Sequence, residues 1–208
     1  MQYLPEILSV SMIAIFMAMS PGADFIMVSR NSIFASRRAG VFSAFGVAAA
    51  IWVHVAYSIA GLAFIISQSI VLFSILKYCG AAYLIYVGWK TFRAKATSAQ
   101  LEGEAQGTLS SWRAFQIGFI TNVLNPKTTL FFFSIFTQVV QVDSPLWLQL
   151  LYGFIISFAH AAWFCAVAIF LSQPVLLQKF EQKKKVIERL VGSLLMGFGL
   201  KIAMSPNP

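Results

Sequence analysis

The chain interrupts its first apolar stretch with Ser20-Pro21-Gly22-Ala23-Asp24, and it interrupts its fourth with Asn122-Val123-Leu124-Asn125-Pro126-Lys127. Because proline cannot donate the backbone hydrogen bond that a helix interior needs, each stretch predicts a helix split into two halves. Asp24 and Lys127 add a charge to each break, where charge inside a membrane is costly. Paired breaks of this kind, in corresponding halves of a membrane protein, are typical of a transporter's binding site.

Composition places the chain among membrane proteins. Hydrophobic residues make up 59% of it, charged residues 11%, and the mean hydropathy is +0.77, whereas soluble domains are about 45–50% apolar. Helices of about 20 residues cross the ~30 Å hydrocarbon core of a bilayer. Apolar runs of that length lie at about 6–29, 41–66, 68–89, 114–141, 146–172 and 186–204. We therefore expect a single all-α transmembrane domain over residues 1–208, with six membrane-spanning helices and breaks in the middle of the first and fourth.

The placement of basic residues predicts the orientation of these spans. Twelve of the fifteen Lys and Arg residues fall in alternate loops: Arg30, Arg37 and Arg38; Lys90, Arg93, Lys95 and Arg113; and Lys179, Lys183, Lys184, Lys185 and Arg189. Because basic loops stay in the cytoplasm, we expect these three loops inside and both termini outside, in the periplasm. The net charge of +8 then forms a basic rim against anionic lipid headgroups rather than a surface for nucleic acid.

The two halves of the chain resemble each other. Ser20-Pro21 matches Asn125-Pro126 at an offset of 105 residues, and His54 matches His160 at an offset of 106. Because three spans precede the second copy, it enters the membrane from the opposite side. The sequence therefore predicts a 3+3 inverted repeat, with repeat 1 at about 1–92, a polar cytoplasmic linker at about 94–111 and repeat 2 at about 112–204.

Each break offers groups that bind charge. Ser20-Pro21 and Asn125-Pro126 have the pattern of a helix N-cap followed by proline at the first helical position. The free N–H groups of a half-helix that starts there favour an anion, such as a carboxylate, and the carbonyl groups released just upstream favour a cation, such as an ammonium group. Two such sites facing each other suit a zwitterion, which indicates an amino acid.

The candidate substrate- or ion-binding residues are the polar and small residues of the two breaks: Asp24, Lys127, Asn125, Asn122, Ser20 and Gly22. Asp24 is interpreted as a site for the substrate ammonium or a proton, with Lys127 as its partner or as the partner of the substrate carboxylate. Alternatively, Asp24 only stabilises the first turn of its half-helix. Asn122 and Asn125 fit hydrogen bonding to substrate, and they fit capping and bonding between helices nearly as well.

His54 and His160 each fall near the middle of an expected span. Histidine titrates near neutral pH, so either residue is a candidate proton relay. The competing interpretation for each is a neutral imidazole that bonds to a neighbouring helix.

Several motifs together resemble the lysine exporter / homoserine-threonine exporter (LysE/RhtB) superfamily of bacterial amino-acid exporters. The motifs that carry the resemblance are Ser20-Pro21-Gly22-Ala23-Asp24-Phe25, Arg30-Asn31-Ser32, Arg37-Arg38-Ala39-Gly40, Gly80 to Lys90, Gly118-Phe119 and Asn122 to Lys127. Ala23 is a departure, since the family pattern often has a second proline there. The resemblance covers nearly the whole chain and implies export of an amino acid or a close derivative across the inner membrane, driven by proton antiport. It does not fix which amino acid.

Two other functions are weighed against export of an amino acid. Efflux of a metal ion or another small solute by a relative in the same superfamily would use His54, His160 and Asp24 as ligands. However, the sequence has no HxxxH or CxxC motif and no His-rich loop, so we expect no metal site. An intramembrane enzyme would need a nucleophile–base set or a motif such as HExxH, and none occurs. No cofactor is expected, and the sequence is compatible with a homo-oligomer.

Overall fold

The computed structural model describes residues 3–68, 70–94, 109–139, 144–170 and 173–204, which contain helices and no strand. In chain order the helices are α1 (Leu4–Met19), α2 (Ala23–Arg30), the π-helix η1 (Asn31–Ala35), α3 (Arg37–Gln68), α4 (Ile70–Phe92), α5 (Ser111–Val123), α6 (Pro126–Val139), α7 (Leu146–Phe170) and α8 (Pro174–Ala203). Most of the linker predicted at about 94–111 lies outside the described residues.

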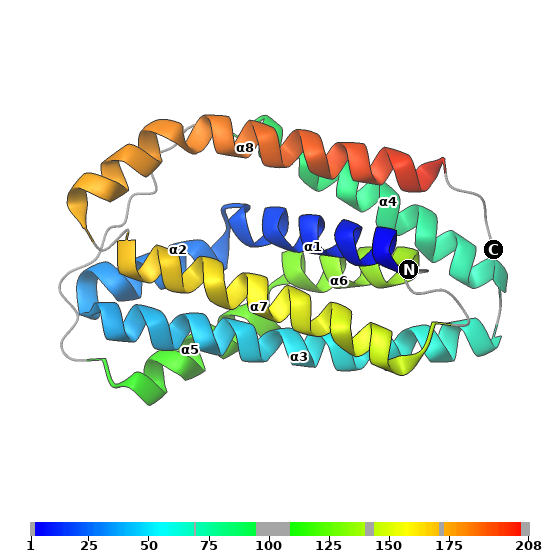
Figure 1. The fold of residues 1–208 in the computed structure, drawn as a ribbon, viewed down its shortest axis with the longest axis horizontal. Coiled ribbons are helices and arrows are strands. Elements are labelled where there is room, and N and C mark those ends of the chain that lie inside the picture. The colour runs from blue at the N-terminus through cyan, green and yellow to red at the C-terminus, as the bar shows by residue number, and fades with distance from the viewer. Residues whose placement is uncertain (1–2, 69, 95–108, 140–143, 171–172, 205–208) are drawn as a thin grey trace.

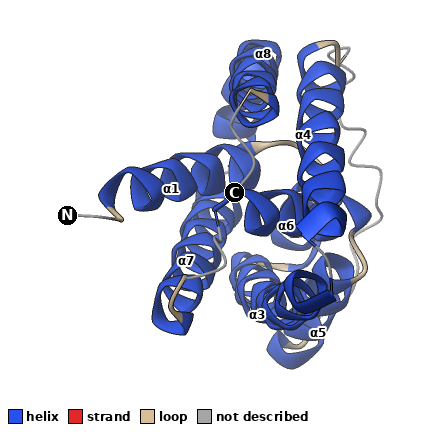
Figure 2. Ribbon diagram, turned by 90° about the vertical axis from the view of Figure 1, so that its right-hand side faces the viewer, coloured by secondary structure: helices blue, strands red, loops and turns tan. Residues whose placement is uncertain are grey.

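The helices form an elongated bundle (Figure 1). Viewed from its end, α4 and α8 lie on one side, α3 and α5 on the opposite side, and α1 and α6 between these two pairs (Figure 2). Helix α7 packs against α3 and α1. Helix α6 lies inside the bundle (Figure 2), and the burial of Ser20, Asp24, Asn122 and Asn125 places both breaks inside it as well.

The chain leaves helical structure at both predicted breaks. Between α1 and α2 the axis bends by 56° over three residues, Ser20 to Gly22. Between α5 and α6 only Leu124 and Asn125 are outside helices, and Pro126 is the first residue of α6. The prediction that these two stretches split a helix is confirmed in both places.

Length and composition identify candidate membrane spans among the described residues. Residues Arg37–Gly61 of α3 and Leu146–Phe170 of α7 qualify as single helices, and the bent unit of α1, α2 and η1 qualifies as a third span. These three candidates correspond to the first, second and fifth of the runs that the sequence predicts.

Helix α8 begins earlier than the sequence predicts. The expected span starts at residue 186, whereas the helix starts at Pro174. Proline is well suited to a first helical turn, and Lys, Gln and Glu are strong helix formers. The basic segment that was expected as a loop, Lys179 to Lys185, is therefore part of a helix.

Glycines set the closest helix contacts. A Cβ built on Gly46 of α3 would overlap the Phe115 carbonyl oxygen of α5, so these two backbones are in direct contact. On the other side of the bundle, a Cβ on Gly88 of α4 would lie 2.7 Å from the Gly192 carbonyl oxygen of α8. Small residues that allow backbones to approach are the usual basis of helix packing in membranes.

Candidate functional site

The two breaks meet at Asp24, which lies in the first turn of α2 and is only 7% exposed. Its Oδ2 accepts two hydrogen bonds from the second break, from Asn122 Nδ2 at 3.0 Å and from Asn125 Nδ2 at 2.9 Å. Both asparagines are buried. Residues that are about a hundred positions apart in sequence thus form one polar cluster.

Lys127 of the second break in turn donates hydrogen bonds to the first break. Its Nζ donates to Ser20 Oγ at 2.7 Å, to the Ser20 carbonyl oxygen at 3.1 Å and to the Pro21 carbonyl oxygen at 3.3 Å. Within the part of the chain that the structure describes, no ion pair joins Lys127 to Asp24. The ammonium group therefore rests on the carbonyl groups that the first break releases, as expected for a cation there.

The two breaks differ in how the second half-helix starts. Asn125 caps α6 as predicted, because its Oδ1 accepts from the Lys127 backbone N–H at 3.0 Å. The prediction that Ser20 caps α2 with Pro21 at the first helical position is wrong. Ser20 ends α1 in an extended conformation, and Gly22 takes the cap position without a side-chain bond. The physical reason is that the Ser20 hydroxyl is engaged by Lys127, and a residue before proline favours extended backbone.

His54 holds the backbone of the second break. Its Nε2 contacts the Asn122 carbonyl oxygen at 3.1 Å, and its Nδ1 contacts the Tyr57 hydroxyl at 2.6 Å. Because a carbonyl group only accepts, Nε2 must carry the proton and Nδ1 accepts from Tyr57 in the neutral ring. The ring also stacks on Phe132, with centroids 5.3 Å apart. Both nitrogens of His54 are therefore occupied.

His160 lies at the polar cluster itself. It lines a small cavity together with Asp24 and Lys127, and its Nδ1 donates to the Ile156 carbonyl oxygen at 2.8 Å. In the neutral ring, this bond leaves the lone pair on Nε2 as the acceptor. Of the two histidines, His160 is thus the one that shares a cavity with the candidate binding residues.

The small cavity around Asp24 has a volume of about 10 Å³, which is about the room that one water molecule needs. Among the described residues, neither Asp24 Oδ1 nor Asn122 Oδ1 has a hydrogen-bond partner, although both are buried. The cluster therefore has unused acceptors, but it is too tightly closed for an amino acid.

A second cavity, of about 450 Å³, lies on the α4 and α8 side of the breaks. Gly22 and Lys127 line both cavities, so they form the wall between them. The lining also includes Lys90 and Thr91 at the C-terminal end of α4. We call this cavity the vestibule.

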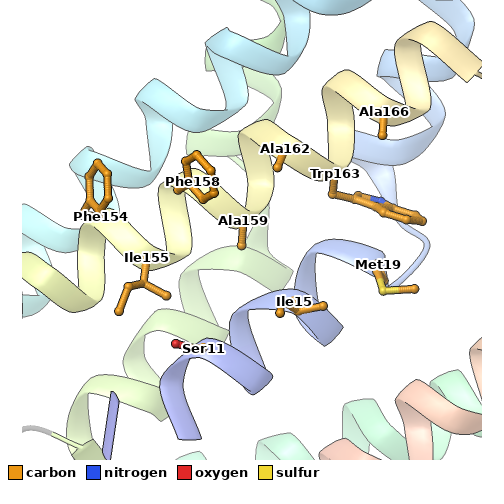
Figure 3. Close-up of a pocket in the computed structure, with 10 residues that line it drawn as sticks. All are labelled: Ser11, Ile15, Met19, Phe154, Ile155, Phe158, Ala159, Ala162, Trp163 and Ala166. Atoms are coloured by element: carbon orange, nitrogen blue, oxygen red, sulfur yellow. The ribbon is translucent and has the colours of Figure 1, made fainter. Parts of the chain in front are cut away.

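A third cavity, of about 530 Å³, lies between α1 and α7 (Figure 3). Its lining is almost entirely apolar and includes Phe154, Phe158 and Trp163. The hydroxyl of its serine, Ser11, donates to the Ile7 carbonyl oxygen. The described residues that line this cavity include no charged group for an ammonium or a carboxylate, so it is unsuited to bind an amino acid.

Sequence reasoning missed three residues of the site. Thr128 Oγ1 accepts from Asn122 Nδ2 at 3.3 Å, and Tyr57 bonds His54. Glu188 of α8 is 4% exposed and lines the vestibule. Thr128 could have been found from the sequence because it directly follows Asn125-Pro126-Lys127. Glu188 gave no such signal, because it lies next to a basic segment for which the sequence predicts a loop. No group of three metal-ligating side chains occurs in the described part of the chain.

The model of the LysE type translocator family matches residues 15–205. The chain belongs to this family. The resemblance of the break motifs is thereby confirmed, and the LysE type translocator described here is a membrane transport protein rather than an enzyme.

Relatives match this translocator over nearly its whole length. The membrane protein YrhP of Bacillus subtilis is 31% identical over 93% of the chain and 96% of its own length. The membrane protein YahN of Escherichia coli is 30% identical over 88% of the chain and 82% of its own length. The threonine efflux protein of Escherichia coli is 28% identical over 95% of the chain and 97% of its own length. No solved structure matches the chain.

Proposed function

We propose that this translocator exports an amino acid or a close derivative from the bacterial cytoplasm across the inner membrane in exchange for protons. The observation that carries the proposal is that a carboxylate and an ammonium group lie together where the breaks meet. A buried carboxylate is held by two amides, and released backbone oxygens hold an alkylammonium group. The ammonium group of an amino acid suits the carboxylate and the released oxygens, and its carboxylate suits the lysine. The similarity to threonine efflux proteins supports an amino acid as the substrate.

Six membrane passes arranged as an inverted repeat are part of the proposal. In Figure 1, α1–α2, α4 and α7 run in one direction, and α3, α5–α6 and α8 run in the other. Helix α3 packs on α7 and α4 packs on α8, while the contact of α3 with α5 has a counterpart in that of α7 with α1. Such contacts between equivalent helices are expected if residues 1–92 and 112–204 are inverted copies.

The distribution of charge supports a cytoplasmic location for one end of the bundle. The starts of α3, α5 and α8 lie together at one end, and the start of α1 and the end of α8 lie at the other (Figure 1). The first group includes the basic residues Arg37, Arg38 and Arg113 and the segment Lys179–Lys185. By the positive-inside rule this end is cytoplasmic, and both termini are then periplasmic.

Lys127 acts in this proposal as a surrogate for the substrate's ammonium group. A primary ammonium has three N–H donors, and Lys127 directs its own to three oxygens of Ser20 and Pro21. The α-ammonium of an amino acid has the same chemistry, so it can replace Lys127 on these oxygens. The displaced lysine and the uncapped N-terminus of α2 then provide positive charge for the substrate carboxylate.

Displacement of Lys127 is also the step that opens the site. The cavity at Asp24 holds about one water, the vestibule is far larger, and Lys127 separates them. An amino acid in the vestibule reaches Asp24 only if Lys127 moves. The vestibule continues from the breaks to the end of α4, which returns toward the basic end of the bundle (Figure 1). The state described here therefore faces the cytoplasm in this proposal.

His160 and Asp24 are the groups proposed to couple transport to protons. His160 shares the cavity of Asp24 and has an acceptor nitrogen in its neutral form. His54 is assigned a positioning role, because both of its nitrogens are bonded and one of them fixes the Asn122 carbonyl group. No carboxylate-rich site for sodium occurs among the described residues, which favours protons as the coupling ion.

The test is efflux of threonine from proteoliposomes with an imposed pH gradient. An acidic exterior should accelerate efflux, because protons entering drive the substrate out, and a protonophore should abolish the acceleration. His160→Gln should remove the dependence on the gradient. His54→Gln, which changes a histidine outside the cavity, should lower the rate but keep the dependence.

Two results would overturn parts of this proposal separately. Efflux that follows the threonine gradient alone, with no response to pH, would identify a facilitator instead of an antiporter. Absence of efflux for threonine and for every other amino acid tested, from correctly inserted protein, would overturn the substrate class.

A further inference from the structure

Besides Asp24, the chain has a second buried carboxylate, and this one lines the vestibule. Glu188 lies on α8, is 4% exposed and lines the cavity. Its Oε2 is buried without a hydrogen-bond partner in the described part of the chain. Lys184, one helical turn earlier, interacts with the same carboxylate electrostatically, but it leaves this oxygen without a donor. A buried acceptor without a donor is costly, and because Glu188 lines the vestibule, a ligand in that cavity can supply the donor.

A positive charge lies on another wall of the same cavity. Lys90 near the end of α4 is exposed and lines the vestibule with Glu188. The cavity volume of about 450 Å³ falls in the usual range for sites that bind small molecules, about 300–1,000 Å³. Opposite charges in a cavity of this size suit a zwitterion better than an ion of one sign.

The packing of α4 on α8 fixes the backbone positions of Glu188 and Lys90 relative to each other. Gly88 lies two residues before Lys90, and Gly192 lies one turn after Glu188. A Cβ on Gly88 would lie 2.7 Å from the Gly192 carbonyl oxygen, and a Cβ on Gly192 would lie 2.5 Å from that of Gly88. Backbones in such close contact leave little freedom for the helices to slide, so both residues stand on rigid elements.

We propose that Glu188 and Lys90 form a vestibule subsite that binds an amino-acid zwitterion before it reaches Asp24. The α-ammonium donates to the Glu188 carboxylate, and the substrate's own carboxylate pairs with Lys90. The inference rests on the proposed function, and it assigns a substrate-binding role to two residues outside the breaks. From this subsite the substrate lies beside Lys127, the residue that it must displace.

The test compares inhibitors that each lack one charge of the zwitterion. Threonine methyl ester keeps the ammonium, and N-acetylthreonine keeps the carboxylate. Competition of each compound with threonine efflux is measured in proteoliposomes for the wild type, Glu188→Gln and Lys90→Gln. Glu188→Gln should raise the KM for threonine about tenfold, as expected for the loss of one charge-assisted hydrogen bond. It should weaken inhibition by the ester and leave inhibition by N-acetylthreonine unchanged.

Lys90→Gln should give the reciprocal pattern, with weaker inhibition by N-acetylthreonine only. Glu188→Asp, which keeps the carboxylate, should restore much of the ester's inhibition. Glu6→Gln serves as the matched control, because Glu6 bonds Tyr152 away from the vestibule, and it should behave as the wild type.

Equal effects of Glu188→Gln on both inhibitors would indicate a structural role and overturn the subsite, as would an unchanged KM. These outcomes are distinct from a failure of the proposed function, which would appear as a wild type that transports no amino acid.

Discussion

Asp24 and Lys127 have opposite charges in the same cluster, yet each is held by neutral groups. Asp24 accepts from the amides of Asn122 and Asn125, and Lys127 donates to oxygens of Ser20 and Pro21. A direct ion pair would neutralise both charges and would have to be broken by every substrate molecule. Amide and carbonyl partners stabilise the charges without cancelling them. In the proposed transport of an amino acid, this arrangement keeps a carboxylate and an ammonium available to the zwitterion.

Asp24→Asn should reduce threonine efflux at least tenfold while membrane insertion stays normal. Asparagine has nearly the same shape and its oxygen can still accept from Asn122 and Asn125, so the cluster should form. The negative charge is lost, however, and removing a charge from the membrane interior favours insertion, by about 2.5–3.5 kcal/mol on insertion scales. Efflux from proteoliposomes and the yield of monodisperse protein in detergent measure the two effects.

The control for this variant is Glu6→Gln, which removes a carboxylate of α1 that accepts from the Tyr152 hydroxyl at 3.0 Å. Efflux of the control should stay near the wild-type rate. Near-normal efflux by Asp24→Asn would reduce Asp24 to a residue that only stabilises the first turn of α2.

At the scale of helices, two glycines on α8 provide a matched pair of variants. Gly192→Ala should lower the unfolding temperature in detergent, because its Cβ would lie 2.5 Å from the Gly88 carbonyl oxygen. Overpacking of this kind costs about 1–3 kcal/mol, which exceeds the gain of about 1 kcal/mol from the better helix propensity of alanine. The unfolding midpoint, followed by circular dichroism or intrinsic fluorescence, measures the change.

Gly197→Ala is the comparison on the same helix. A Cβ there meets nothing within 4 Å among the described residues, so only the propensity gain remains and the midpoint should stay equal or rise. Equal destabilisation by both variants would contradict the assignment of Gly192 as the contact point of α4 and α8.

The sequence predicted the two breaks and the N-cap of α6 because these features depend on local chemistry. Pro126 cannot continue a helix, and Asn125 caps the next one with its own side chain. The start of α2 could not be predicted, since it depends on Lys127, more than a hundred residues away, which binds the Ser20 hydroxyl. The partners of Asp24 are long-range in the same way.

The early start of α8 was missed for a different reason. Hydropathy indicates which residues favour lipid, whereas a helix can extend beyond the apolar part. The segment Lys179–Lys185 is strongly hydrophilic, yet its Lys, Gln and Glu residues are good helix formers. Glu188 lies inside the expected span, but the pattern of apolar residues does not show that this part of α8 packs on α4. Glu188 could therefore be recognised only once that packing was known.

At the scale of the whole molecule, the two halves have similar but unequal contacts. Helix α6 packs well on α4, whereas the equivalent contact in an inverted repeat, α2 on α8, is at most marginal among the described residues. The vestibule lies where that second contact is weak, between α4, α8 and the breaks. In the proposed inverted repeat, halves with unequal contacts are what is expected of a transporter that is open to one side.

The orientation of the whole chain in the membrane can be tested by labelling single cysteines at its two ends. Single cysteines at Ser36 and Gln182 should be protected from an impermeant maleimide in intact cells, and cysteines at Leu4 and Met204 should be labelled. All are made in a background that lacks Cys79 and Cys165, and none changes the charge of the chain. The reason is the cluster of Lys and Arg at the end that includes Ser36 and Gln182, where each basic residue gains about 1 kcal/mol from an anionic cytoplasmic surface.

Lysed cells, in which all four sites should react, are the control for accessibility. Labelling of Gln182→Cys together with protection of Met204→Cys would reverse the orientation. Protection at only one of Leu4 and Met204 would contradict an even number of passes.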